Sequence, residues 1–425
     1  MNLKPYQVAG AQFLAARKFA FLADQMGLGK SAQAIRGCDL VHAKTVVVIC
    51  PAVARVNWQR EFELWGQQDR HVFVYSYDKV ATDARVRASI EAAKPDVLIC
   101  DEAHYLKTRS TKRTIAIYGK GCKNNGVAQH ATRVWLLTGT PCPNDAGELF
   151  PHLRALWPET IKKADGAMNY VEFINRYCVV LKTPFGDKII GNKNAAELRS
   201  ILATFMLRRK AGDVLKELPA INWAVTPIEP DHVLSDLPRL EQTPEVEALR
   251  TSLNDGVLPE SGLVALATLR RVTGLAKAGV AARMLREELE SDAYQKIVVF
   301  VQHLDVGKTL MEQLSAYGTV FLNGSTTPTM KQKMIDDFQR NPEVRVFVGQ
   351  LQACSTAITL HAANQVLFVE QSWTPSDNAQ AAKRCHRIGQ TRPVFVRMLG
   401  LAKSIDEAVA RVLARKTQAI AEILE

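Results

Sequence analysis

The chain has 425 residues, of which 47% are hydrophobic and 23% are charged, so it is long enough for two or three globular domains. This composition excludes a disordered, collagen-like or low-complexity chain. Lys and Arg number 54 against 43 Asp and Glu, and the resulting net charge of +11 favours a polyanionic partner.

The chain carries no pattern that would direct it to a membrane or a secretory route. It begins MNLKPYQ, without a signal-peptide pattern, and no apolar run reaches the roughly 18 residues of a membrane span. We therefore expect a cytoplasmic protein. The eight cysteines form no C-x-x-C pair, so we expect small buried side chains rather than zinc ligands or disulfides.

Short β-branched runs alternate with helical patterns along the chain. The predicted strands are Val46–Cys50, Val97–Cys100, Val134–Leu137, Ile297–Val301, Val344–Val348 and Val366–Val369. The predicted helices include Val56–Trp65, Gly307–Tyr317, Thr329–Gln339 and Ser404–Leu424. This alternation predicts an α/β fold with parallel sheets, in which ligands bind at the carboxyl ends of strands.

The α/β pattern is interrupted in the middle of the chain. Residues 151–290 are mostly helical in pattern and include a proline-bearing stretch typical of a linker, with prolines at 219, 227, 230, 238 and 244. We predict one α/β lobe over residues 1–150 and a second over 291–425, joined by a helical insertion and bridging segment over 151–290.

A glycine-containing loop follows the apolar run that begins at Phe19. Gly27, Leu28 and Gly29 would let backbone N–H groups approach phosphate oxygens, Lys30 would reach the β- and γ-phosphates, and Ser31 would hold Mg²⁺. Asp24 stands where the full phosphate-loop pattern has its first glycine, so a plain turn before a helix remains open. Upstream, the Gln7 amide could pair with an adenine edge, although a surface glutamine is the simpler interpretation.

Two carboxylates end the predicted strand at residues 97–100, in the sequence VLICDEAH. Asp101 would orient Mg²⁺, and Glu102 would position or deprotonate the attacking water. Alone this could be a solvated acidic turn. After a glycine-lysine loop, it predicts ATP and Mg²⁺ as cofactors. The next strand ends in LTGTP, whose hydroxyls at Thr138 and Thr140 are candidates for sensing the γ-phosphate.

From Ala103 to Asn144 the chain has no acidic residue. Seven basic residues lie in this window: Lys107, Arg109, Lys112, Arg113, Lys120, Lys123 and Arg133. Such a window beside predicted catalytic carboxylates indicates a track for the DNA backbone, with a solvated basic loop as the alternative. Nothing in it is suited to reading bases, so we expect little sequence specificity.

A basic block near the C-terminus reads QAAKRCHRIGQ. Gln380, Arg384 and Arg387 fall at i, i+4 and i+7, which predicts one helix face ending near Gly389. Arginines aimed at a transferring phosphate stabilise its charge. If these arginines reach the nucleotide, the two lobes must close over it. A basic surface helix is the alternative.

The ordered set LKPYQ, MGLGKS, DEAH, LTGTP, LRRK and QAAKRCHRIGQ strongly resembles the Swi/Snf-type ATPases of helicase superfamily two. The resemblance spans nearly the whole chain, and HRIGQ is its most specific part. The R-Y-C block ending at Cys178 and the segment Gly191–Asn194 resemble the annealing-helicase branch, which would connect the chain with DNA repair.

The resemblance implies two RecA-like lobes and an ATP-dependent motor that tracks along duplex or branched DNA. It implies that Gln7 contacts adenine, that Lys30, Ser31, Asp101 and Glu102 serve phosphate, metal and water, and that Gln380, Arg384 and Arg387 complete the site, with the arginines as fingers.

Two positions depart from the family pattern. Gln25 replaces a usual acid, which should be tolerated. Ala353–Leu360 reads ACSTAITL where the family has a glycine-rich loop, and fewer glycines restrict the backbone there. This second departure motivates an alternative function, a nucleotide-gated DNA-binding scaffold with negligible turnover. A true strand-separating helicase is a further alternative.

Overall fold

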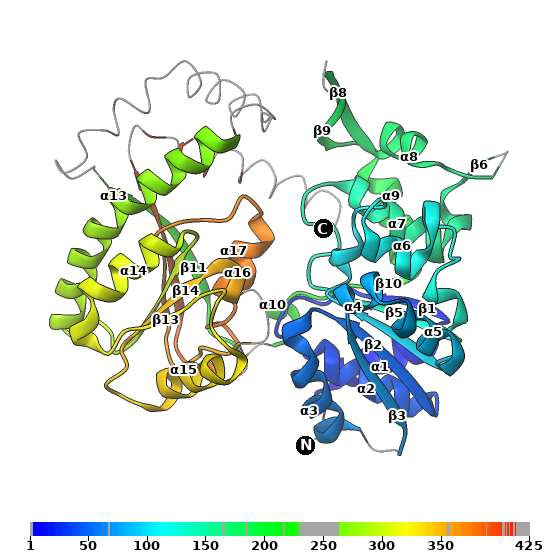
Figure 1. The fold of residues 1–425 in the computed structure, drawn as a ribbon, viewed down its shortest axis with the longest axis horizontal. Coiled ribbons are helices and arrows are strands. Elements are labelled where there is room, and N and C mark those ends of the chain that lie inside the picture. The colour runs from blue at the N-terminus through cyan, green and yellow to red at the C-terminus, as the bar shows by residue number, and fades with distance from the viewer. Residues whose placement is uncertain are drawn as a thin grey trace. The chain divides into compact units, whose positions relative to one another are not determined.

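The computed structural model describes residues 3–66, 69–163, 166–183, 186–215, 217–228, 263–354, 358–387, 389–401, 404, 406–407, 409–410 and 413. The chain forms two compact units, of which the first contains Met1–Lys216 and the second Glu217–Thr417. Figure 1 shows a parallel sheet covered by helices in each unit. Each unit is described by itself.

The first unit is built on six parallel strands in the order β10-β1-β5-β4-β2-β3. Their bounds are β1 (Phe19–Leu22), β2 (Thr45–Cys50), β3 (His71–Ser76), β4 (Val97–Asp101), β5 (Arg133–Leu137) and β10 (Met206–Leu207). The central strands are apolar and buried on both faces, which is why they appear in the sequence as continuous β-branched runs.

Helices cover both faces of the first sheet. On one face lie α1 (Pro5–Ala15), α2 (Lys30–Leu40) and α3 (Arg55–Trp65), which bury Leu14, Ile35 and Trp58 against the strands. The opposite face is covered by α4 (Tyr77–Thr82), α5 (Ala84–Ala93), α6 (Lys112–Tyr118), α7 (Phe150–Leu156), α8 (Tyr170–Tyr177) and α9 (Ala195–Ala203). Two small hairpins, β6 (Lys162–Lys163) with β7 (Gly166–Ala167) and β8 (Cys178–Thr183) with β9 (Gly186–Asn192), complete the unit, and α10 (Ala211–Val214) lies at its end.

The second unit is also a six-stranded parallel sheet, in the order β11-β16-β15-β12-β14-β13. The strands are β11 (Ile221–Ile228), β12 (Ile297–Val301), β13 (Val320–Leu322), β14 (Val346–Gln350), β15 (Gln365–Phe368) and β16 (Val394–Leu401). One face packs against α13 (Leu263–Glu290) and α14 (Leu304–Gln313), and the other against α15 (Pro328–Arg340), α16 (Leu351–Cys354) and α17 (Pro375–Ala382) (Figure 1).

The structure confirms the predicted α/β class and all six predicted strands, to within about two residues at their ends. The helices predicted at Val56–Trp65 and Thr329–Gln339 are α3 and α15. The pattern at 307–317 is divided between α14 and a short 3₁₀ turn at Ser315–Tyr317. Most of the helix predicted at 404–424, and Pro230, Pro238 and Pro244 of the predicted linker, lie outside the described residues.

The segment 151–290 contributes to both units. Its first part supplies α7, α8, α9 and the edge strand β10 to the first unit, and its last part supplies β11 and α13 to the second. Each of the eight cysteines is free and buried, as predicted. Within the described residues, no helix combines the length and apolar character required to cross a membrane.

Candidate functional site

The loop between β1 and α2 has a backbone shape that depends on glycine. Gly27 and Gly29 have φ angles of 87° and 71°, and Gly29 is the N-cap residue that precedes α2. At positive φ a side chain is strained, so glycine is favoured at both positions. The loop therefore presents the N-terminus of an 11-residue helix, whose free N–H groups attract anions, as the predicted phosphate site requires.

Lys30 and Gln7 both contact this loop. Lys30 Nζ donates to the carbonyl oxygen of Asp24 at 2.9 Å, across the base of the loop. Gln7 is 6% exposed, and its Nε2 donates to the carbonyl of Leu28 at 3.3 Å. A Cβ atom at Gly29 would lie 2.4 Å from Gln7 Nε2, so the two residues are in close contact. Gln7 thus belongs to the loop assembly, and its contact with adenine stays a prediction.

Asp101 ends β4 as a partly buried carboxylate with few compensating charges. Its Oδ2 accepts a hydrogen bond from Trp58 Nε1 at 2.7 Å, and its Oδ1 accepts one from the Glu102 backbone at 3.0 Å. Burial and the neighbouring Glu102 raise the pKa of Asp101 to about 7, against the opposing effects of Trp58 and Lys30. The raised pKa means that the ionised form of this carboxyl is disfavoured. A cation bound beside it would stabilise that form.

Glu102 links the acidic turn to the end of β5. Its backbone is left-handed, with φ of 49°, which is uncommon outside glycine. Its Oε2 accepts a hydrogen bond from the Thr138 hydroxyl at 3.4 Å and lies 3.4 Å from His104 Nδ1. His104 Nδ1 is also 3.0 Å from the Thr138 hydroxyl and 3.4 Å from that of Thr140. The two motifs predicted to sense nucleotide are therefore in direct contact.

Three further residues support this cluster, and their roles were not predicted from the sequence. Trp58 comes from α3 and holds Asp101, and Tyr77 from α4 donates to the Asp101 carbonyl at 2.8 Å. Arg209 forms an ion pair with Asp24, which is fully buried. Asp24 comes shortly after an apolar strand, and a buried acid at such a place requires a charged or hydrogen-bonding partner. This position could have indicated the ion pair.

The four residues predicted to contact DNA differ in their surroundings. Lys107 Nζ forms an ion pair with Glu148 at 2.7 Å, so its charge is compensated within the unit. The guanidinium groups of Arg109 and Arg113 lie over the rings of Tyr170 and Tyr105, at 4.7 Å and 5.3 Å from the ring centres. Lys112 is exposed at the first turn of α6. Their role in DNA binding stays a prediction.

The predicted arrangement of the basic block in the second unit is wrong in one respect. The helix α17 ends at Ala382, so it contains Gln380 but neither Arg384 nor Arg387, and the three residues do not share one helix face. The chain turns after the helix, Leu360 N donates to the Arg384 carbonyl at 2.8 Å, and Gly389 has a φ of 103° in the turn rather than at a helix end. The i, i+4 and i+7 spacing predicted a continuous helix. The prediction failed because tertiary hydrogen bonds replace the last helical turns.

Gln390 explains why the chain turns here. It is 5% exposed, and its Nε2 lies within 3.2 Å of the carbonyls of His361, Ala363 and Cys385. Its Oε1 accepts hydrogen bonds from the backbone N–H groups of Thr391 and Arg392, both at 3.1 Å. This one amide fixes the loop that carries the arginines. Arg387 Nη1 donates to the Thr359 hydroxyl at 3.2 Å, and Arg384 is 3% exposed.

Three of the described residues of the segment at 353–360 belong to the core. Cys354, Ile358 and Leu360 are fully buried beneath α15 and α17, and residues 355–357 lie outside the described residues. Lys331 Nζ donates to the Ala353 carbonyl at 2.9 Å, and its pKa is lowered by burial and by the charge of Arg384. The segment that departs from the family pattern is therefore next to two cationic side chains.

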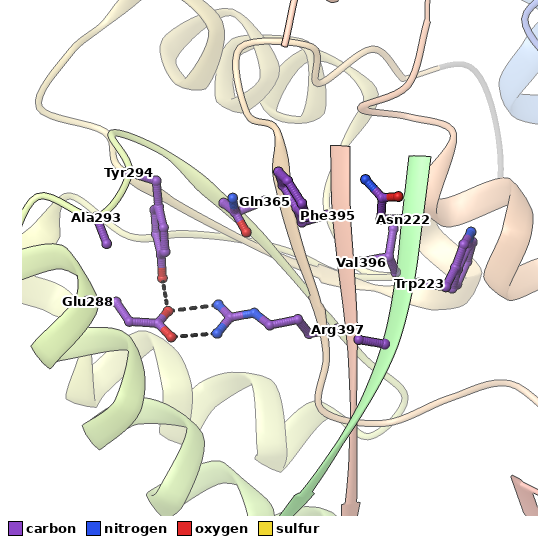
Figure 2. Close-up of a pocket in the computed structure, with 10 residues that line it drawn as sticks. Asn222, Trp223, Glu288, Ala293, Tyr294, Gln365, Phe395, Val396 and Arg397 are labelled. Atoms are coloured by element: carbon purple, nitrogen blue, oxygen red, sulfur yellow. Dashed lines mark hydrogen bonds and ion pairs between the residues drawn. The ribbon is translucent and has the colours of Figure 1, made fainter. Parts of the chain in front are cut away.

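The second unit also has a hollow of about 460 Å³ that no prediction anticipated. Figure 2 shows that it lies beside β11 and β16, with Trp223 and Phe395 among its lining residues. The Glu288 carboxylate accepts hydrogen bonds from Arg397 Nη2 at 2.7 Å and from the Tyr294 hydroxyl at 2.5 Å. Asn222, Gln365 and Phe395 belong to the first two residues of their strands, so the hollow is at the amino ends rather than at the carboxyl ends.

Two sequence families match the chain, each over one part of it. The SNF2-related domain matches residues 66–252, and the helicase conserved C-terminal domain matches residues 280–389. The chain therefore carries an SNF2-related domain followed by a helicase conserved C-terminal domain. The two parallel-sheet units are the RecA-like lobes that the resemblance implied.

SNF2-related relatives align with almost the whole chain. The mouse (Mus musculus) protein named DNA annealing helicase and endonuclease ZRANB3 is 28% identical over 98% of this chain and 40% of its own length. The Drosophila melanogaster SWI/SNF-related matrix-associated actin-dependent regulator of chromatin subfamily A-like protein 1 is 28% identical over 99% of this chain and 56% of its own length. The chain thus spans about half the length of these relatives.

A solved structure is also similar, the "Sulfolobus solfataricus SWI2/SNF2 ATPase core in complex with dsDNA". It is 24% identical, with a TM-score of 0.44 over 100% of this chain and 93% of that chain. The two six-stranded parallel sheets themselves establish the α/β fold.

Proposed function

We propose that this SNF2-related chain is a DNA-stimulated ATPase motor that translocates along duplex or branched DNA and remodels DNA or protein–DNA complexes. The observation that carries the proposal is the cluster in the first unit, where Asp101 has a raised pKa and Glu102 contacts Thr138, beside the loop that carries Lys30. Groups from three parallel strands, β1, β4 and β5, meet there, as expected for a ligand site at the carboxyl edge of a sheet.

In this proposal the loop and the N-terminus of α2 bind the phosphates of ATP. Lys30 exchanges its bond to the Asp24 carbonyl for one to a phosphate oxygen, which supplies charge where the transferring group becomes more negative. Gln7, which contacts the loop through Leu28, would lie beside the adenine. The helix N-terminus favours the same anionic groups.

Ser31 and Asp101 are the residues that would hold Mg²⁺. A divalent cation supports the ionised form of Asp101, whose pKa is raised in its absence, so the donor set fits the ion. When bound, Mg²⁺ neutralises phosphate charge. Glu102 orients the attacking water and accepts its proton, while Thr138 and His104 hold the carboxylate in position.

The second unit supplies the remaining groups. Arg384 and Arg387 stabilise the charge of the transferring phosphate, and Gln380 supports the nucleotide, as the family resemblance implies. The Gln390 amide contributes indirectly, because it holds the loop on which both arginines lie. Turnover then requires both units to act on one nucleotide, which is the basis for motion along DNA.

DNA is the proposed polyanionic partner. Arg109, Lys112 and Arg113 supply positive charge in the window that lacks acids, and contacts of this kind bind the phosphate backbone without reading sequence. One relative is named as a DNA annealing helicase, which supports branched DNA as the substrate and a role in DNA repair.

The test is the rate of ATP hydrolysis with no DNA and with duplex, single-stranded and forked DNA. We expect duplex or forked DNA to raise kcat at least tenfold. Salt-sensitive DNA binding with no hydrolysis under any condition would reject the motor and favour the nucleotide-gated scaffold. A strand-separation assay beside a triplex-displacement assay distinguishes an unwinding helicase from a translocase, which displaces the third strand without unwinding the duplex.

A further inference from the structure

The segment 205–211, here called the exit strap, is hydrogen-bonded to the residues that lead into the nucleotide loop. It contains β10 and runs beside β1, and its pairing continues past the end of that strand. The backbone bonds run from Phe21 N to Phe205 O at 3.0 Å, from Ala23 N to Leu207 O at 2.8 Å and from Gln25 N to Arg209 O at 3.0 Å. The strap therefore extends the sheet into the loop, and the first unit ends shortly after it.

A buried ion pair joins the strap to the same loop. Arg209 Nε donates to Asp24 Oδ1 at 2.9 Å, and Asp24 is fully buried. Arg209 Nη2 also donates to Gln33 Oε1 at 2.8 Å, and Gln33 Nε2 is 3.1 Å from Asp24 Oδ2 and 3.0 Å from the Leu28 carbonyl. The side chains of Asp24, Arg209 and Gln33 are thus hydrogen-bonded to one another, and Gln33 joins them to the loop backbone at Leu28.

The cluster packs closely against α1. A Cβ atom at Gly10 of α1 would lie 1.8 Å from Gln33 Oε1 and 2.7 Å from Arg209 Nη2, so α1 packs directly on it. Arg209 also donates to the Tyr6 carbonyl. Only a guanidinium can reach these partners together, because its donors are fixed in one plane.

Asp24 connects the strap to the lysine of the phosphate site. Its carboxylate holds Arg209, and its carbonyl oxygen accepts the hydrogen bond from Lys30. When a phosphate draws Lys30 away, the constraint on the Asp24 carbonyl is released. A shift of this peptide must be followed by Arg209, because a buried charge separated from its partner is strongly unfavourable.

We propose that the exit strap, through the Asp24–Arg209–Gln33 cluster, is a positioning element that transmits the state of the nucleotide loop to the chain segment leaving the first unit. The proposal rests on the proposed function in one respect, that the loop binds nucleotide. Gln25 strengthens the connection, since its Oε1 accepts a hydrogen bond from Ala211 N at 2.8 Å. The glutamine that replaces a usual acid thus still caps the helix α10.

The test is hydrogen exchange of the full chain with and without ADP and Mg²⁺. In the wild type we expect nucleotide to slow amide exchange at least threefold both in residues 19–31 and in residues 205–214, with residues 84–93 as an internal reference. Protection of 19–31 with no change in 205–214 would overturn the proposal.

The decisive variant is Asp24→Asn combined with Arg209→Met. Removing both charges leaves no lone buried ion, so the protein should fold. We expect it to bind ADP and to protect 19–31 alone, with at least a tenfold lower DNA-stimulated kcat and a KM within threefold of wild type. Arg199→Met, which alters an exposed arginine on α9, is the matched control and should behave as wild type.

Two further results complete the design. Arg209→Lys keeps the charge but not the three contacts, so we expect an intermediate loss of protection in 205–214, and this variant serves if the double variant does not fold. Joint protection retained in either variant would overturn the proposal. Joint protection in a wild type that DNA does not stimulate would overturn the proposed motor and leave the strap's role standing, whereas a chain that binds no nucleotide would overturn both.

Discussion

The two sheets carry a carboxylate at comparable places and use it differently. Asp101 is the last residue of β4 in the first unit, and burial together with the neighbouring Glu102 raises its pKa to about 7. Glu370 follows β15 in the second, where it accepts hydrogen bonds from Gln302 N at 2.8 Å and His303 N at 2.9 Å and lies 2.6 Å from His303 Nδ1. The two sheets have similar topology, but their carboxylates differ in role. Asp101 is available to a ligand, whereas Glu370 holds the backbone of its own unit.

Lys30→Ala tests the proposed ligand site of the first unit most directly. We expect no measurable hydrolysis, because the loop loses the charge that stabilises the transferring phosphate, worth roughly 10³-fold or more in rate. The measurement is phosphate release with saturating duplex DNA. Lys44→Ala, at an exposed lysine between α2 and β2, is the control. Hydrolysis within tenfold of wild type would contradict the assignment of the loop.

Arg387→Ala tests whether the second unit contributes to chemistry. We expect nucleotide affinity to change less than threefold and kcat to fall by roughly 10³-fold, as for loss of an arginine that stabilises phosphate charge. Binding of a fluorescent nucleotide and steady-state turnover separate these effects. Arg340→Ala, at the exposed end of α15, should leave both unchanged. Unchanged turnover in the Arg387 variant would restrict catalysis to the first unit.

Glu370→Gln sharpens the structural side of the comparison. The substitution retains one acceptor oxygen but loses the charge that holds the loop after β12. We expect the free energy of unfolding to fall by about 2 kcal/mol. Chemical denaturation measures it, with Gln313→Ala on the exposed face of α14 as the control. A folded variant with unchanged stability and no ATPase activity would show that Glu370, like Asp101, is a functional carboxylate.

The pH dependence of stability tests the environment of Asp101. Its pKa in the folded protein is about 7 against an ordinary value of 3.8, so between these two pH values the folded state binds more protons than the unfolded state. The free energy of unfolding contributed by this group must then fall as pH rises from about 4 to 7. We expect Asp101→Asn to reduce that decline in the nucleotide-free protein. An identical slope in both proteins would contradict the burial argument.

The smallest expected effects concern DNA. Lys112 is exposed, whereas Lys107 is already paired with Glu148 at 2.7 Å. We therefore expect Lys112→Ala to lower the slope of log binding constant against log salt concentration by about one, and Lys107→Ala to lower it less. Titrations of one duplex at several salt concentrations measure both. A larger change in slope for Lys107→Ala would contradict this assignment and would place the DNA-binding surface nearer α7.

The class of fold could be predicted because it depends on patterns within short stretches of the sequence. Continuous apolar runs such as Ile297–Val301 are typical of strands buried on both faces, and the acid pair at the end of β4 lies where ligands bind in such sheets. Edge strands were harder: β11 includes the exposed Trp223, and β10 has only two residues, so neither forms a recognisable run.

Contacts between distant parts of the chain could not be predicted. The bond from Trp58 to Asp101 and the pairing of Asp24 with Arg209 join residues 43 and 185 positions apart. The helix predicted through Arg384 and Arg387 failed for the same reason, because the Gln390 amide draws the chain into a turn that a local pattern does not encode. The positions of these residues were predictable from the motif, but their geometry depends on tertiary hydrogen bonds.

The central claim is that the carboxylates of the first unit catalyse DNA-stimulated ATP hydrolysis. The most direct measurement is kcat of the wild type and of Glu102→Gln, with and without saturating duplex or forked DNA, beside nucleotide affinity. We predict at least tenfold stimulation of the wild type by DNA, and a variant that binds nucleotide with wild-type affinity but turns over at least a hundredfold more slowly. A wild type that no DNA stimulates, or a variant that hydrolyses ATP at the wild-type rate, would contradict the account.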